Sequence, residues 1–136
     1  MFKFSRKIEY ALMVLQYMYV REEQHLFSSR EICDDLKIPF DTTSKVLQTL
    51  THTKVLKSTQ GIQGGYCLDL NLSQFKLYDF ITSIENSSSS IACESGDCEL
   101  MNHCNIQKPL KKIHNLVSNY LKTISVKEIL DNKNGN

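Results

Sequence analysis

The spacing of apolar residues predicts a helix near the start of the chain. Ser5 can cap it, because its side chain can accept a hydrogen bond from a backbone amide of the first turn. The apolar positions that follow recur every three or four residues: Ile8, Ala11, Leu12, Leu15, and Met18 or Tyr19. This pattern indicates a helix that buries one face.

Two shorter helices joined by a turn are predicted next. Ser28 and Glu31 have the spacing of a capping box at the start of the first. Pro39 ends it, because the residue before a proline is disfavoured in the helical region. Asp41 is expected to be the N-cap of the second helix. Its apolar face holds Val46, Leu47 and Leu50. The order is that of a helix-turn-helix.

Residues 55–59 and 66–70 predict a β-hairpin directly after these helices. The loop between them contains Gly61, Gly64 and Gly65, which we expect to supply positive backbone dihedral angles. A hairpin alone suits an ordinary α+β domain equally well. Its position after the helix-turn-helix favours a wing.

The C-terminal half predicts two further helices. Ser73 is expected to cap the first, which ends at Asn86, and the serines 87–90 connect it to a cysteine segment. Pro109 suits the first turn of the second helix. Its apolar residues have the spacing of a coiled-coil seam: Leu110, Ile113, Val117, Tyr120 and Ile124. A narrow seam favours a homodimer contact over packing on the same domain.

The predicted fold is mainly α with a small β-hairpin, an α+β winged helix-turn-helix with a long C-terminal dimerisation helix. We expect a DNA-binding domain at residues 1–85, a cysteine loop at 86–106, a dimerisation helix and C-terminal segment at 107–130, and a polar tail at 131–136.

Composition adds few restrictions to this picture. The chain of 136 residues suits one compact domain, and its net charge of +1 neither supports nor excludes DNA as a partner. No apolar stretch is long enough to span a membrane. The basic N-terminus could mimic a signal peptide, but Glu9 interrupts its apolar run and no cleavage site follows. We expect a cytoplasmic protein.

Three of the five cysteines lie close together, at Cys93, Cys98 and Cys104. Soft thiolates on a loop suit zinc or an iron–sulfur cluster. Zinc sites usually have paired ligands two to four residues apart and a full set of four, which this segment lacks. A reversible disulfide is a further alternative. The pattern favours an iron–sulfur cluster, of either four-iron or two-iron type.

A cluster held by three cysteines has one coordination position left. His103 is a local candidate and Glu9 a distant one; a partner subunit or a small molecule could also fill it. Cys33 falls in a predicted helix and Cys67 in a strand, so both are interpreted as packing residues.

These segments resemble the Rrf-two family of bacterial winged-helix transcription regulators over nearly the whole chain. The resemblance includes KIEYALMVLQYM, the GxxGGY wing after the helix-turn-helix, the cysteine loop and the long final helix. The cysteine spacing is more similar to that of NsrR-like members than to that of IscR-like members. The latter use a histidine three residues after the last cysteine, where this chain has Gln107.

The resemblance implies a function and a ligand set. In NsrR-like members an acidic residue of the first helix is the fourth cluster ligand, contributed across the dimer, and the matching position is Glu9. The implied protein is a homodimeric repressor whose binding to double-stranded DNA is controlled by a cluster that senses nitric oxide or redox state. An IscR-type regulator of iron–sulfur or iron status, or a cluster-free thiol-redox regulator of the same fold, is the alternative.

The second helix of the helix-turn-helix is expected to enter the major groove by its N-terminal residues. Many relatives have an arginine just before the first wing glycine, where this chain has Gln60. The candidate DNA-binding residues are Ser29, Arg30, Asp41, Thr42, Thr43, Ser44, Lys45, Gln48, Gln60 and Gln63. Candidate phosphate contacts are Lys3, Arg6, Lys7, Arg30, Lys45 and Lys57.

Two other classes of protein compete with this interpretation. An enzyme is not expected, because no nucleophile, base and orienting group occur at a suitable spacing, and Cys104 beside His103 is not such an arrangement. An electron-transfer protein could hold the same cluster. It would not need a helix-turn-helix, a wing or a dimer seam.

Overall fold

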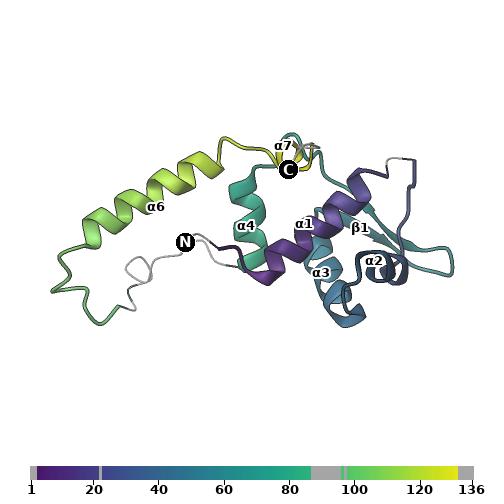
Figure 1. The fold of residues 1–136 in the computed structure, drawn as a ribbon, viewed down its shortest axis with the longest axis horizontal. Coiled ribbons are helices and arrows are strands. Elements are labelled where there is room, and N and C mark those ends of the chain that lie inside the picture. The colour runs from purple at the N-terminus through teal and green to yellow at the C-terminus, as the bar shows by residue number, and fades with distance from the viewer. Residues whose placement is uncertain (1–2, 22, 87–95, 97, 132–136) are drawn as a thin grey trace.

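The computed structural model describes residues 3–21, 23–86, 96 and 98–131. The described elements, in chain order, are α1 (Arg6–Tyr19), α2 (Ser29–Leu36), α3 (Phe40–His52), β1 (Leu56–Thr59), β2 (Gly65–Leu68), α4 (Leu77–Glu85), α6 (Gln107–Leu121) and α7 (Val126–Leu130). Figure 1 shows α1 to α4 and the hairpin gathered in one domain, with α6 extending from it as an arm. The predicted fold class, mainly α with a small β-hairpin, is confirmed.

The first two helices begin as their sequences predict. The Ser5 side chain accepts a hydrogen bond from the Ile8 amide, and both halves of the Ser28–Glu31 capping box are formed. The predicted N-cap of α3 was wrong. Pro39 occupies that position without a side-chain cap, and Asp41 lies inside the first turn. A carboxylate there still stabilises the helix, since it lies near the positive end of the helix dipole.

The hairpin forms a two-stranded antiparallel sheet in which Leu56 pairs with Leu68 and Thr59 with Gly65. The strands are shorter than the predicted 55–59 and 66–70. Of the three wing glycines, only Gly61 has a positive φ, of 113°. The other two allow close approach of backbones. A Cβ on Gly64 would lie 2.1 Å from the Thr59 carbonyl oxygen, and one on Gly65 would lie 2.7 Å from that of Phe27.

One hydrophobic core joins the N-terminal domain to the end of the chain. Ala11, Val14 and Leu15 of α1 are completely buried at its centre. Val126 and Leu130 of α7 belong to the same core cluster. The C-terminal segment therefore has two parts, since α6 leaves the domain and α7 packs back onto it (Figure 1).

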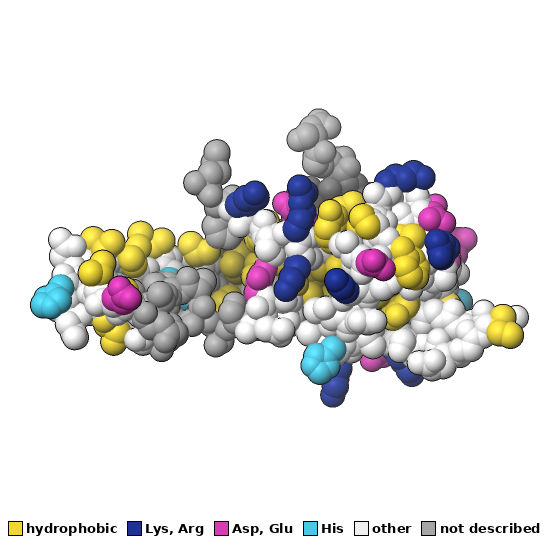
Figure 2. Space-filling model, turned by 90° about the horizontal axis from the view of Figure 1, so that it is seen from below, with side chains coloured by type: hydrophobic (Ala, Val, Ile, Leu, Met, Phe, Trp, Pro, Cys, Tyr) yellow, Lys and Arg dark blue, Asp and Glu magenta, His cyan; other side chains and the backbone are white. Residues whose placement is uncertain are grey.

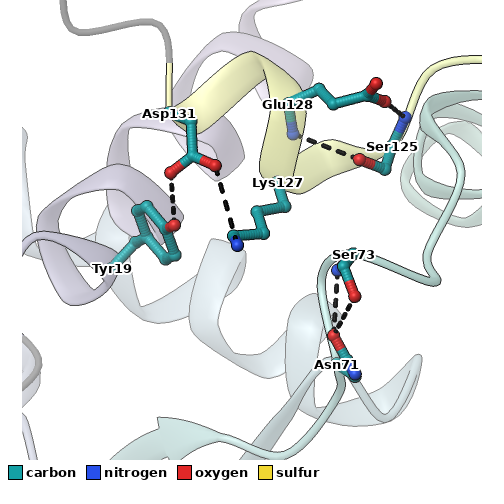
Figure 3. A network of polar contacts seen from close by, with 7 residues as sticks. All are labelled: Tyr19, Asn71, Ser73, Ser125, Lys127, Glu128 and Asp131. Carbon is teal, nitrogen blue, oxygen red and sulfur yellow. Dashed lines mark hydrogen bonds and ion pairs between the residues drawn. The ribbon is translucent and has the colours of Figure 1, made fainter.

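The segment before α4 meets the segment before α7. The Leu77 amide donates to the Ile124 carbonyl at 2.8 Å, and the Val126 amide donates to the Phe75 carbonyl at 2.8 Å. The expected cap of α4 by Ser73 was wrong, because the helix begins at Leu77 with Lys76 as its N-cap. Ser73 instead donates its amide and hydroxyl to Asn71 in a turn (Figure 3).

A hydrogen bond connects the end of α7 to α1. The Tyr19 hydroxyl donates to Asp131, and the Lys127 ammonium lies 3.8 Å from the same carboxylate (Figure 3). Ser125 and Glu128 form a second capping box at the start of α7. The Glu128 carboxylate is hydrogen-bonded to the backbone and to the side chain of Ser125. These hydrogen bonds hold the pKa of Glu128 below its usual value. No helix in the described ranges is long and apolar enough to cross a membrane.

Candidate DNA interface and cysteine segment

The second helix of the helix-turn-helix, α3, has one buried and one exposed side. Val46, Leu47 and Leu50 are buried in the core as predicted. Most of the expected DNA contacts of α3 lie on its outer side: Asp41, Lys45 and Gln48 are exposed, and Thr42 and Ser44 are half-buried.

Thr43 does not fit the role predicted for it. Its side chain is completely buried, and its hydroxyl donates to the Pro39 carbonyl at 3.1 Å. Because helix periodicity turns this position toward the core, the Thr43 side chain is not available for contact with DNA in this structure.

The junction of α2 and α3 contains an exposed aromatic residue that the sequence analysis missed. Phe40 is the first residue of α3, and the guanidinium of Arg30 lies over its ring at 4.8 Å. Ser29 is half-buried and Arg30 exposed. A cation stacked on an aromatic ring is held in a defined place, so Arg30 is presented at the start of α3. The signal in the sequence was an aromatic residue directly after the turn proline.

The wing presents polar residues and one apolar side chain. Gln60 and Gln63 are exposed, and Ile62 between them is fully exposed. Ile62 was not among the predicted contacts. Figure 2 shows lysine and arginine side chains on the N-terminal domain, whereas the arm on the left carries hydrophobic side chains.

A hydrogen bond connects α1 to α2, and a cation stacks on the same tyrosine. The Tyr17 hydroxyl donates to Asp35 at 2.6 Å, and the Arg21 guanidinium lies 3.7 Å from the Tyr17 ring centroid. Burial, followed by the hydrogen bond to Asp35, raises the pKa of Tyr17 to about 12. This hydrogen bond ties α1 directly to the first helix of the helix-turn-helix.

The two described loop cysteines, Cys98 and Cys104, are half-buried free thiols. Cys93 lies outside the described residues. Successive backbone turns connect Cys98 to Cys104. In these turns the Met101 amide donates to the Cys98 carbonyl, and the His103 amide donates to the Leu100 carbonyl. The segment leads into α6 at the outer end of the arm, away from α1 of the same chain (Figure 1).

Glu9 lies on α1 and not with the cysteines. Its carboxylate forms an ion pair with Arg6 at 3.0 Å and is partly exposed. Among the residues with described positions, no three His, Cys, Asp or Glu side chains form a group that could hold a metal ion. His103 is exposed beside Cys104.

A groove of about 570 Å³ runs along α1 beside α7, and Glu9 lines one part of it. Its wall includes exposed apolar side chains, namely Met13, Val20 and Ile129. We call it the α1/α7 groove.

The arm has an apolar face exposed to solvent in the single chain. It comprises Leu110, Ile113, Leu116, Val117 and Tyr120. Leu116 was missed by the sequence analysis. Ile124 lies beyond the end of α6 and packs against the domain core, so the expected seam is shorter by that residue.

The family model named Rrf2, described as an iron-dependent transcriptional regulator, matches residues 4–132. The chain belongs to the Rrf2 family. YffB of Lactococcus lactis, named as an HTH-type transcriptional regulator, is 26% identical over 139 residues, which cover 95% of this chain and 87% of YffB.

Solved structures of Rrf2 regulators share the fold. CymR of B. subtilis, a global cysteine regulator, has a TM-score of 0.76 at 18% identity and covers 98% of this chain and 100% of its own. IscR of T. potens has a TM-score of 0.68 at 17% identity, covering 96% and 88%. This Rrf2 protein is accordingly a DNA-binding transcription regulator and not an enzyme.

The remaining cysteines of the Rrf2 chain lie apart from the loop. Cys33 is buried in α2, and burial raises the pKa of its thiol. Its sulfur donates to the Arg30 carbonyl at 3.2 Å. Cys67 is half-buried in β2. The position of Cys33 suits a packing residue, because a buried protonated thiol is a poor metal ligand.

Proposed function

We propose that this Rrf2 regulator is a homodimeric repressor that holds an iron–sulfur cluster on Cys93, Cys98 and Cys104, and that nitric oxide or oxidation of the cluster controls its binding to operator DNA. The observation that carries the proposal is the pair of free thiols, Cys98 and Cys104, on one turn-rich segment. The description of the family as iron-dependent supports the choice of metal.

The donor set fits such a cluster. Cys98 and Cys104 are not joined in a disulfide, and both are partly accessible. Thiolates are soft ligands that select iron–sulfur clusters over hard cations. When bound, the cluster would supply a centre that reacts with nitric oxide or oxidants, while the chain's own residues hold it and transmit its loss.

The apolar face of the arm supports the homodimer. From Leu110 to Tyr120 this face is about 15 Å long, and the α1/α7 groove from Glu9 to Val20 is about 16.5 Å long, at 1.5 Å per helical residue. An exposed apolar face and a largely apolar groove of similar length on one chain suit mutual docking of two copies about a two-fold axis.

Docking of this kind explains how Glu9 could serve as the fourth ligand. If the partner's α6 lies in the α1/α7 groove parallel to α1, its cysteine-bearing end meets the end of the groove lined by Glu9. Glu9 would then leave Arg6, its present ion-pair partner. Because α1 packs on α3 and is hydrogen-bonded to α2, loss of this ligand would move the helix-turn-helix.

For DNA contact, we infer that α3 enters the major groove with Asp41, Lys45 and Gln48. Thr42 and Ser44 flank them, and Gln60 and Gln63 extend from the wing. Thr43 is left out because it is buried. Arg30, stacked on Phe40, would contact a phosphate at the start of α3.

Cysteine variants test the cluster directly. The protein purified without oxygen is expected to absorb visible light and to contain iron and sulfide. Replacing all three of Cys93, Cys98 and Cys104 by alanine should remove all of these signals. The matched controls Cys33→Ala and Cys67→Ala should retain them. A triple variant with the iron and sulfide content of the wild type would overturn the proposal.

A second experiment tests Glu9. Glu9→Ala is expected to keep a cluster on three cysteines, to change its spectrum, and to lose the nitric-oxide-dependent release of DNA. Glu23→Ala, an exposed carboxylate after the end of α1, is the control. If Glu9→Ala kept the wild-type spectrum and the same response to nitric oxide, His103 or an exogenous ligand would take its place.

A cluster-free thiol-redox regulator is the second candidate, because Cys98 and Cys104 are free thiols six positions apart. The two functions are separated by the metal-free protein treated with a thiol oxidant. A reversible change in DNA affinity in protein that never contains iron favours the thiol switch.

A further inference from the structure

A second groove lies on the side of the domain that carries the recognition helix. It is bounded by the first turns of α1, by α3 and by the end of α4, and has a volume of about 250 Å³. Its apolar lining includes Ala11, Val46 and Ile84, all buried side chains of the core. We call it the α1/α3 groove; it differs in every lining residue from the α1/α7 groove.

The edge of the α1/α3 groove is basic. Arg6, Lys7 and Lys45 line it, and its described lining includes no Asp or Glu. Arg6 is already bound to Glu9, at 3.0 Å. Within the part of the chain that the structure describes, Lys7 and Lys45 form no ion pair, and both are exposed. Two unpaired ammonium groups from two helices therefore face one apolar hollow.

We propose that the α1/α3 groove binds a small carboxylate with an apolar body, and that this ligand weakens DNA binding. The apolar body would cover the hydrocarbon surface of the groove, which is the main source of affinity in pockets of this kind. The carboxylate would accept charge-assisted hydrogen bonds from Lys7 and Lys45. A DNA phosphate could reach the same lysines but has no apolar group to fill the hollow.

The ligand would act on DNA binding in two ways. Lys45 and Thr42 line the groove and also belong to the inferred DNA contacts, so a bound carboxylate competes with phosphate for the same cation. It would also lie between α1 and α3, whose packing sets the orientation of the recognition helix. This regulatory part rests on the proposed function, whereas binding of the carboxylate does not.

Binding is tested by titration calorimetry on the full-length protein without DNA, with octanoate as the probe and 1-octanol as its uncharged counterpart. Octanoate is expected to bind once per chain, at least about tenfold more tightly than octanol. Lys7→Gln and Lys45→Gln should each weaken it about tenfold, the loss of one charge-assisted hydrogen bond. Lys112→Gln, an exposed lysine on α6, is the control.

A filling variant tests the hollow itself. Thr49 lines the groove, and its hydroxyl only donates to the Lys45 carbonyl of its own helix, so Thr49→Leu should fold normally. It should block octanoate while leaving both lysines in place. No octanoate binding by the wild type, equal binding of octanol, or unchanged binding by Thr49→Leu and both lysine variants would overturn the site.

Competition then tests the regulatory part. Octanoate should lower the DNA affinity of the wild type, measured by fluorescence anisotropy at fixed salt, and should leave that of Thr49→Leu unchanged. Octanoate binding with unchanged DNA affinity overturns the regulation and leaves the site standing. Octanoate binding by a protein that binds no DNA overturns the proposed DNA contacts alone.

Discussion

Val117→Glu is expected to dissociate the proposed homodimer without unfolding the chain. Val117 lies in the middle of the apolar face of α6 and is 39% exposed in the single chain. A glutamate there remains hydrated in the monomer, because that surface already faces solvent. In the dimer the same position would be covered by the partner's α1/α7 groove.

The expected loss of dimerisation free energy counts the substitution twice, because each dimer contains two copies of α6. Covering the exposed part of each valine is worth about 1 kcal/mol, or about 2 kcal/mol per dimer. Burying unpaired carboxylates adds a further penalty of about 2 kcal/mol or more. A total of about 4 kcal/mol weakens the dimer Kd about a thousandfold.

Sedimentation velocity over a range of concentrations measures this effect, and circular dichroism checks that the variant is folded. Asn115→Glu is the matched control, since Asn115 is an exposed residue that the helical repeat places on the side of α6 away from the apolar face. It should remain as dimeric as the wild type. A Val117→Glu protein whose dimer Kd stays within about threefold of the control would refute the assigned face.

Three further results are expected. Gly65→Ala should lower the free energy of unfolding by about 1–3 kcal/mol in chemical denaturation, because its Cβ would lie 2.7 Å from the Phe27 carbonyl oxygen; an unchanged midpoint would contradict that contact. The pKa of Tyr17 is raised to about 12, so the unfolded chain loses this proton at lower pH than the folded chain. The free energy of unfolding should therefore fall as pH rises from 10 through 12. Tyr17→Phe should remove this part of the pH dependence of stability. Burial and the raised pKa of Cys33 should make maleimide react with it far more slowly in the native protein than in urea, and equal rates would show that the site opens freely.

The elements with strong local signals were predictable from the sequence. Ser5 and Ser28 carry their own capping side chains, and a capping box is read from two residues three apart. The apolar face of α3 followed from helix periodicity alone. The same reasoning identified the exposed face of α6, because its spacing is independent of what covers it.

The predictions that failed depend on contacts between distant segments. The start of α4 is set by the carbonyl of Ile124, far along the chain, and not by Ser73. Gly65 is required because the Phe27 backbone approaches it closely. Rules for local turns do not predict a contact between segments so far apart in the sequence. Thr43 has a hydroxyl suited to DNA, but its burial depends on how α3 packs in the folded domain.

The candidate site was predictable only as a set of residues and not as an arrangement. The cysteine spacing indicated a soft-metal ligand set, yet Glu9 lies on α1 and forms no metal-binding group with the described cysteines of its own chain. In the proposed homodimer a second copy would bring them together, and the sequence of one chain indicates only the apolar face of that contact. The unpaired lysines of the α1/α3 groove had no local sequence signal, because α1 and α3 meet only after folding.

The most direct test of the account is the affinity for operator DNA of one protein preparation in three states: with its cluster, after exposure to nitric oxide, and after removal of iron. Affinity should be measured without oxygen and at fixed salt, because phosphate contacts make it salt-dependent. Tight binding by the cluster-loaded state, with at least about tenfold weaker binding by the other two, a difference of about 1.4 kcal/mol, is the predicted result. Equal affinities in all three states would contradict control by an iron–sulfur cluster.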